Sequence, residues 1–171
     1  MGSQEILLVE PCSVQHIEVL LAGKLPFFET FGVTIADDYE LLPHMLEFSL
    51  KGLLETNVLP RWWTHLFMLH HSRVAVGIGG YKGNPDANGV VEIGYSIAPS
   101  YQGQGLATQA ARTMIERAFA DQSVTLVRAH TLATETPSAS VLRKVGMVRV
   151  ADSNDAMEGK VWRWQVTLPH P

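Results

Sequence analysis

The sequence is poor in the groups that build cross-links and metal sites. Cys12 is the only cysteine among 171 residues, so the chain forms no internal disulfide. A lone thiol is typical of a reducing compartment, and we interpret Cys12 as a packing residue because no activating neighbour accompanies it. His70 and His71 would point to opposite faces of a strand and could not share an ion. We therefore predict no metal site.

Positive charge and long apolar runs are also scarce. The chain has 13 basic and 17 acidic residues and a formal net charge of −4, whereas binding to nucleic acid or an anionic membrane surface favours a basic excess. No apolar run is long enough to cross a bilayer, and no basic segment followed by an apolar stretch marks a secretory signal. We expect a cytoplasmic monomer or homodimer that binds neither membrane nor nucleic acid.

What is present suffices for one packed core, since 46% of the residues are hydrophobic. Domains commonly have roughly 100–200 residues, so we expect a single domain over residues 1–171. The hydrophobic pattern predicts an α+β fold, with a mixed, mostly antiparallel sheet of about six to seven strands and about four helices packed on it. The expected strands cover 5–9, 63–71, 73–81, 90–98, 124–131, 147–151 and 161–167, and the expected helices lie after Ser13 and over 39–54, 106–119 and 137–144. Gly and Pro punctuate residues 23–31, which we interpret as a connection.

The most informative stretch covers residues 90–108, VVEIGYSIAPSYQGQGLAT. A strand ends at Pro99, a short loop carries Gly103 and Gly105, and a helix begins at once. Free backbone N–H groups at the positive end of a helix form a phosphate site, and glycines leave room for a pyrophosphate. A glycine pair alone fits an ordinary tight turn equally well.

Two other nucleotide-binding loops are excluded. The chain has no GxxxxGK[ST] motif, so it is not a P-loop protein. Gly103-x-Gly105-x-x-Thr108 lacks the third glycine of the dinucleotide fingerprint, and residues 128–131 supply no ribose-binding acid at the end of the next strand. A nucleotide hydrolase therefore has no support beyond the glycines.

Two motifs together resemble the GNAT superfamily of N-acetyltransferases. Residues 102–107 resemble its [R/Q]-x-x-G-x-[G/A] pyrophosphate loop, and residues 138–147 resemble its S-x-x-V-L-x-K-x-G-F helix. Over residues 63–165 the chain is most similar to the branch of ribosomal-protein N-terminal acetyltransferases. The resemblance implies the GNAT fold, acetyl-CoA as co-substrate with no metal, and an amine acceptor. It implies cofactor contacts at Ile97, Ala98, Gln102, Gly103, Gln104, Gly105, Leu106, Ala107 and Thr108, with a backbone N–H near Ile97 stabilising the oxyanion.

Two positions depart from the family pattern. Glu135 stands where the family often has an asparagine bonded to pantetheine, so we assign the cofactor contact to Glu135. Leu142 stands where many relatives carry a tyrosine that protonates the leaving thiol. Ser138 is then the candidate proton donor, although it equally suits the polar start of a helix.

Glu92 is the candidate general base, acting through water. It is the only acid within an apolar strand, where burial would raise the pKa of a carboxyl group. The alternative is that Glu92 is an edge-facing carboxylate or one partner of a buried ion pair. For the acceptor pocket we predict the apolar and histidine side chains of Phe27, Phe28, Phe31, Trp62, His65 and His130, although such residues are more often core.

The sequence therefore predicts transfer of an acetyl group from acetyl-CoA to a primary amine by direct attack in a ternary complex. The alternative is a non-catalytic acyl-CoA-binding or sensing module, which the departures at Glu135 and Leu142 would suit. A polyamine needs several converging carboxylates, and none cluster near residues 23–31. A small hydrophobic amine or a peptide N-terminus is therefore the expected acceptor.

Overall fold

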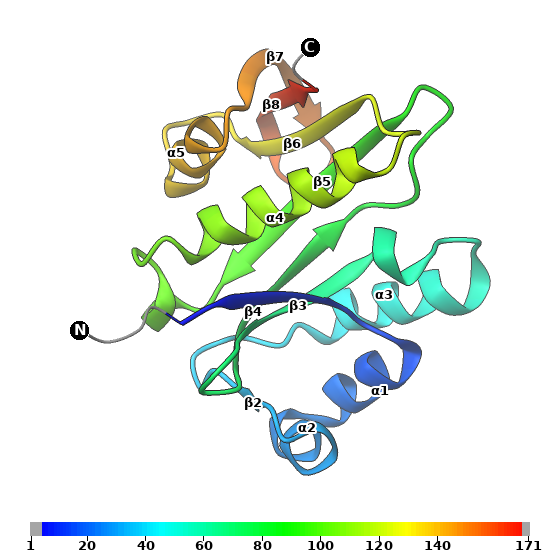
Figure 1. Ribbon diagram of the computed structural model, residues 1–171, viewed down its shortest axis with the longest axis vertical. Coiled ribbons are helices and arrows are strands. Elements are labelled where there is room, and N and C mark those ends of the chain that lie inside the picture. The colour runs from blue at the N-terminus through cyan, green and yellow to red at the C-terminus, as the bar shows by residue number, and fades with distance from the viewer. Residues whose placement is uncertain (1–4, 169–171) are drawn as a thin grey trace.

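The computed structural model describes residues 5–168, which form one mixed sheet with helices on both faces (Figure 1). The sheet order is β1-β3-β4-β5-β6-β8-β7, with β2 beside β4. The strands are β1 (Leu7–Pro11), β2 (Thr34–Ile35), β3 (Thr64–Leu69), β4 (Val74–Tyr81), β5 (Val90–Ile97), β6 (Leu126–Leu132), β7 (Val148–Asp155) and β8 (Gly159–Thr167). The helices are α1 (Val14–Ala22), α2 (Lys24–Phe31), α3 (Pro43–Glu55), α4 (Leu106–Ala120) and α5 (Pro137–Lys144).

The sheet opens between its two central strands. β5 and β6 are parallel and pair only over Val90–Glu92 and Leu126–Arg128. Beyond Glu92 and Arg128 they diverge, while β5 stays paired with β4 on its other side as far as Ile97. On its β6 side, β5 therefore has no neighbouring strand from Ile93 onward.

Two hydrophobic cores lie on opposite faces of the sheet. The predicted apolar stripe of α4, which includes Ala110, Ala111, Met114 and Ala118, is buried with α5 against one face. Helices α1, α2 and α3 cover the other face over β3 and β4. The second core does not extend over β6, β7 and β8.

The α+β prediction is confirmed, with more elements than expected. Residues 24–31 form helix α2 and not a connection, because Pro26 falls in the first helical turn, where no backbone N–H is needed. Phe27 and Phe31 then lie one turn apart, with ring centroids 4.7 Å from each other. Strand β2 is too short for a periodic pattern and was not predicted. The prediction of a single domain is not tested.

Within residues 5–168 no helix is both long enough and apolar enough to cross a membrane.

Candidate active site

A groove of about 840 Å³ occupies the opening between β5 and β6, and we call it the strand groove. Its lining comes from the ends of β5 and β6, the turn that follows β5, the first turn of α4 and most of α5. The groove therefore leads from the N-terminus of α4 into the middle of the sheet.

The loop before α4 has the conformation that a phosphate site requires. Gly103 and Gly105 have φ angles of 75° and 79°, in the left-handed region that favours glycine. A Cβ built at either position meets no atom within 4 Å, so the space beside both is open. Gly105 is the N-cap of α4 and provides no side-chain cap, which leaves the first N–H groups of the helix available. The Gln102 amide donates to the Ile97 carbonyl at 2.9 Å and ties the loop to β5.

Most of the predicted cofactor residues line the strand groove, namely Ile97, Gln102, Gly103, Gly105, Leu106, Ala107 and Thr108. Three do not. Ala98 is fully buried and its N–H donates to the Val76 carbonyl, and the Gln104 side chain donates to the Ser100 carbonyl. Glu135 does not line the groove, and both of its oxygens accept from Arg143, at 2.6 and 2.7 Å, so the structure gives no support to the expected pantetheine contact.

The backbone of β5 also directs donors into the groove. The Ala98 N–H and the Glu92 carbonyl both bond toward β4, and backbone groups alternate in direction along a strand. The N–H groups of Tyr95 and Ile97 therefore face the side where β6 has moved away. This supports the expected oxyanion donor at Ile97.

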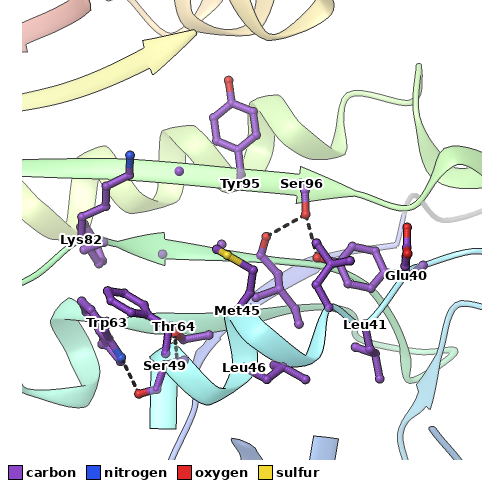
Figure 2. A pocket seen from close by; sticks show the side chains of 18 of the residues that line it. Glu40, Leu41, Met45, Leu46, Ser49, Trp63, Thr64, Lys82, Tyr95 and Ser96 are labelled. Carbon is purple, nitrogen blue, oxygen red and sulfur yellow. Dashed lines mark hydrogen bonds between the residues drawn. The ribbon is translucent and has the colours of Figure 1, made fainter. Parts of the chain in front are cut away.

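A second cavity, of about 640 Å³, lies between α3 and the sheet, and we call it the α3 cavity (Figure 2). Its floor is the bare backbone of Gly79, Gly80 and Gly94. Met45 and Trp63 form part of its apolar wall, and Figure 2 shows Met45 directed from α3 toward β5. The Trp63 indole N–H donates to the Ser49 carbonyl at 2.8 Å, which holds the wall to α3.

The two cavities meet at a common boundary. Tyr95, Ser96 and Glu158 line both of them. Tyr95 and Ser96 come from β5, whereas Glu158 comes from the turn between β7 and β8. The Ser96 hydroxyl is held by the Tyr39 hydroxyl at 2.7 Å. A group bound at the end of the strand groove would therefore be next to one bound in the α3 cavity.

Comparison with known proteins identifies the family of this chain. The family model described as "Acetyltransferase (GNAT) domain" matches residues 45–148, which is more than half of the chain. The chain belongs to the GNAT acetyltransferase family. The motif-based prediction of that family is confirmed.

The individual relatives have low sequence identity to this chain. The uncharacterized N-acetyltransferase YjdG of Bacillus subtilis is 26% identical over 113 residues, which cover 66% of this chain and 65% of YjdG, just under two thirds of that relative's length. RimL, a ribosomal alpha-N-protein acetyltransferase, in complex with coenzyme A has a TM-score of 0.67 at 15% identity and covers 96% of this chain and 95% of its own. A chimera of Vibrio cholerae spermidine N-acetyltransferase with hSSAT also reaches 0.67, at 13% identity, covering 94% and 95%. These structures share the GNAT fold, and their names give different acceptors.

The predicted acceptor residues lie apart from the α3 cavity of this GNAT domain. Phe27, Trp62 and His65 are buried in the cores, and the His65 ring bonds to the Trp63 carbonyl at 2.9 Å. Phe31 packs on Phe27, and Phe28 is on the exposed side of α2. The apolar character of these residues reflects core packing, and we no longer assign them to the acceptor. His130 lines the strand groove.

The Glu92 carboxylate is hydrogen-bonded to two other side chains and is not free to act as a base. Its Oε1 atom accepts from Lys82 Nζ and from His130 Nδ1, each at 2.8 Å, and Glu92 lines neither cavity. Burial raises the pKa of its carboxyl group, but the bonds from Lys82 and His130 outweigh burial and hold the pKa below its ordinary value. The prediction of a raised pKa is therefore wrong, because an isolated strand sequence does not show these two partners.

Ser138 does line the strand groove, at the start of α5. The helix is capped by Thr136, whose hydroxyl accepts from the Ala139 N–H, so Ser138 is not needed as the cap. The Tyr95 hydroxyl donates to the Ser138 carbonyl at 3.4 Å, and burial raises the pKa of Tyr95. Leu142 is buried in the core, away from any proton transfer.

Several lining residues were not predicted. Lys144, the lysine of the α5 motif, lines the strand groove, and its place in the motif was the available signal. Glu158 had no signal, because its turn is distant in sequence from every motif. Among the residues with a described position, no three His, Cys, Asp or Glu side chains are grouped to hold a metal ion.

Proposed function

We propose that this GNAT protein transfers the acetyl group of acetyl-CoA to a primary amine, by direct attack while both substrates are bound. The observation that supports this most is the common boundary of the strand groove and the α3 cavity at Tyr95, Ser96 and Glu158. A module that only binds acyl-CoA needs the groove but not an adjoining second cavity.

Acetyl-CoA is the proposed occupant of the strand groove. Its pyrophosphate would rest on the N–H groups between Gly103 and Thr108, where the helix dipole and the open space beside Gly105 favour an anion. Lys144 of α5 also lines the groove and supplies a cation. Pantetheine would pass through the opening between β5 and β6 and bring the thioester to Ile97.

The chemistry then requires three groups. The amine must be neutral to attack, and an ordinary lysine-like amine has a pKa of about 10.4. The Ile97 N–H faces the opening and would stabilise the oxyanion of the tetrahedral intermediate. Ser138 is the proposed donor to the leaving thiolate, a modest contribution because an ordinary thiol has a pKa of about 8.5.

The α3 cavity favours an acceptor with an apolar body. Leu41, Met45, Phe48, Trp63 and Ile78 contribute to its lining. The charged residues that line it are Glu40, Lys82 and Glu158, so carboxylates do not surround it. Two carboxylates beside one lysine cannot pair every charge of a polycation buried there. We therefore favour a small hydrophobic amine or a peptide N-terminus over spermidine.

Thiol release from acetyl-CoA with a panel of amines tests the proposal. The panel contains apolar monoamines, peptides with apolar N-termini, spermidine and an aminoglycoside, and mass spectrometry identifies the acetylated product. Amine-dependent release, highest with an apolar amine or peptide, is expected. Tight binding of acetyl-CoA with no turnover on any amine would favour a binding module, and highest kcat/KM with spermidine would overturn the acceptor preference.

A further inference from the structure

Lys82, Glu92 and His130 form a hydrogen-bonded group that connects the two cavities. One oxygen, Glu92 Oε1, accepts from both Lys82 Nζ and His130 Nδ1 at 2.8 Å. Lys82 lines the α3 cavity and His130 lines the strand groove. Glu92 lines neither cavity, so Lys82 and His130 are the members of the group that face the substrates.

We propose that His130 Nε2 is the general base that takes a proton from the acceptor ammonium, and that Glu92 is the positioning residue that fixes the His130 tautomer. This inference rests on the proposed acetyltransferase function. It assigns His130 a proton-transfer role in place of the pocket-wall role expected from the sequence.

The tautomer follows from hydrogen-bond chemistry. An ionised carboxylate only accepts hydrogen bonds, so the proton of a neutral His130 ring must be on Nδ1, facing Glu92. Nε2 then carries a free lone pair. Lys82 donates to the same oxygen, which favours the ionised form of Glu92 and keeps this arrangement.

The strand geometry places His130 at the opening between β5 and β6. His130 is two residues past Arg128, the last β6 residue paired with β5, so it stands at the start of the opening. Tyr95 and Ser96, at the boundary of the cavities, line the same groove. Imidazole is also the side chain that most often serves as a general base in enzymes.

The charged neighbours of His130 come from every adjoining element. Glu92 is on β5, Lys82 follows β4, Arg128 is on β6 itself, and Arg163 is its cross-strand partner on β8. The β7–β8 hairpin adds Asp155 and Glu158. The pKa of Asp155 is lowered first by the N–H groups of Met157 and Glu158, and also by the charges of Lys82 and His130. Of these groups, only Glu92 forms a hydrogen bond with the His130 ring in the described part of the chain.

The proton balance of the step is complete. The ammonium gives one proton to His130 Nε2, and the neutral amine nitrogen forms a bond to the thioester carbon. The C–S bond breaks as the tetrahedral intermediate collapses, and the second proton lost from nitrogen reaches the thiolate, with Ser138 as the relay. His130 then releases its proton to water, so one proton is produced for each acetyl group transferred.

The tautomer is tested without any turnover. Long-range ¹H–¹⁵N spectra of protein labelled at histidine, above the pH at which the ring becomes neutral, distinguish protonated from unprotonated ring nitrogens, and His130→Gln identifies the His130 signals. Protonation on Nδ1 in wild type is expected. In Glu92→Gln, whose amide can donate to Nδ1, the Nε2 tautomer should appear. Protonation on Nε2 in wild type would overturn the positioning role.

Kinetics with the best amine test the base. General-base catalysis contributes about 10²–10⁴-fold, so we expect His130→Gln to lower kcat by at least about 10²-fold at pH 7. Glu92→Gln should lower kcat by a smaller factor, and both deficits should shrink as the pH approaches that at which solvent deprotonates the amine. Acetyl-CoA affinity should change far less than kcat, because the pyrophosphate loop and Lys144 are untouched. His70→Gln, on an exposed turn, is the matched control and should equal wild type.

The two hypotheses fail in different ways. Amine-dependent turnover in wild type that His130→Gln leaves unchanged would overturn the base role and leave the proposed function standing. A kcat deficit that is constant across pH would show a structural role for His130 and would also overturn it. Wild type that binds acetyl-CoA without turnover on any amine would overturn the proposed function, and the base role with it.

Discussion

Replacing Gly94 with valine would fill the floor of the α3 cavity without disturbing the fold. Gly94 lies in β5, and a Cβ built there meets only Lys82 Cε, at 3.9 Å, an ordinary van der Waals distance. Its backbone is outside the left-handed region, and a β-branched residue suits a strand. We therefore expect Gly94→Val to fold.

The size of the effect follows from the reach of the side chain. Each carbon–carbon bond adds about 1.5 Å, so the valine methyl groups project two bonds above the floor. An amine resting there would be displaced by more than about 1 Å, and a misplacement of about 1 Å can lower the rate by about 10²-fold. We expect kcat/KM for the amine to fall by about 10²-fold in Gly94→Val and by less in Gly94→Ala.

Three measurements make the result decisive: kcat/KM for the amine, calorimetric affinity for acetyl-CoA, and Tm. Affinity should be unchanged because Gly94 does not line the strand groove. Glycine in a strand costs roughly 0.5–1 kcal/mol, so Tm should hold or rise by up to about 4 °C. Gly79→Val is the contrasting variant, since its Cβ would lie 2.4 Å from the Gly94 carbonyl oxygen and 2.5 Å from Phe67 Cζ, and it should lose stability. Wild-type kcat/KM in folded Gly94→Val would refute an acceptor site in the α3 cavity.

Three further predictions concern the groove and the core. Gly105→Glu puts a strained backbone and a negative charge in the phosphate site, so calorimetry should show acetyl-CoA affinity reduced at least about tenfold, or about 1.4 kcal/mol. An affinity equal to that of wild type would show that the pyrophosphate does not bind at this loop. Lys144→Met should weaken the binding of acetyl-CoA several-fold at low salt and little at about 1 M salt, where the Debye length is only about 3 Å. A loss of affinity that does not depend on salt would contradict an electrostatic role for Lys144. Burial raises the pKa of the Cys12 thiol to about 12. At pH 8 a disulfide reagent should therefore label Cys12 in native protein no faster than the protein unfolds, and should label it at once in denaturant. Rapid labelling of native protein would contradict the burial of Cys12.

The sequence predicted the elements whose signals are local. The stripe of α4 repeats with helical spacing, and Gly103 and Gly105 precede it directly, so both helix and phosphate loop follow from neighbouring residues. The same holds for α5, whose observed bounds match the expectation. Helix α2 was missed because Gly23 and Pro26 resemble loop punctuation, although a proline in a first turn is compatible with a helix.

The acceptor side could not be predicted in this way. The α3 cavity is formed by α3, the glycines of β4 and β5, and the turn at Glu158, which are brought together only by tertiary packing. The pairing of Glu92 with Lys82 and His130 crosses three segments as well, and it reverses the pKa direction expected from burial alone. The aromatic residues of α2 were assigned to the pocket because composition does not distinguish core from cavity wall.

The central claim is that the acetyl group passes directly from thioester to amine while the two adjoining cavities are both occupied. Initial rates measured over a grid of acetyl-CoA and amine concentrations test this most directly. Direct transfer predicts double-reciprocal lines that intersect, and intact-mass spectra with no acetyl group on the protein after incubation with acetyl-CoA alone. Parallel lines together with an acetylated protein would show a covalent intermediate and contradict the account.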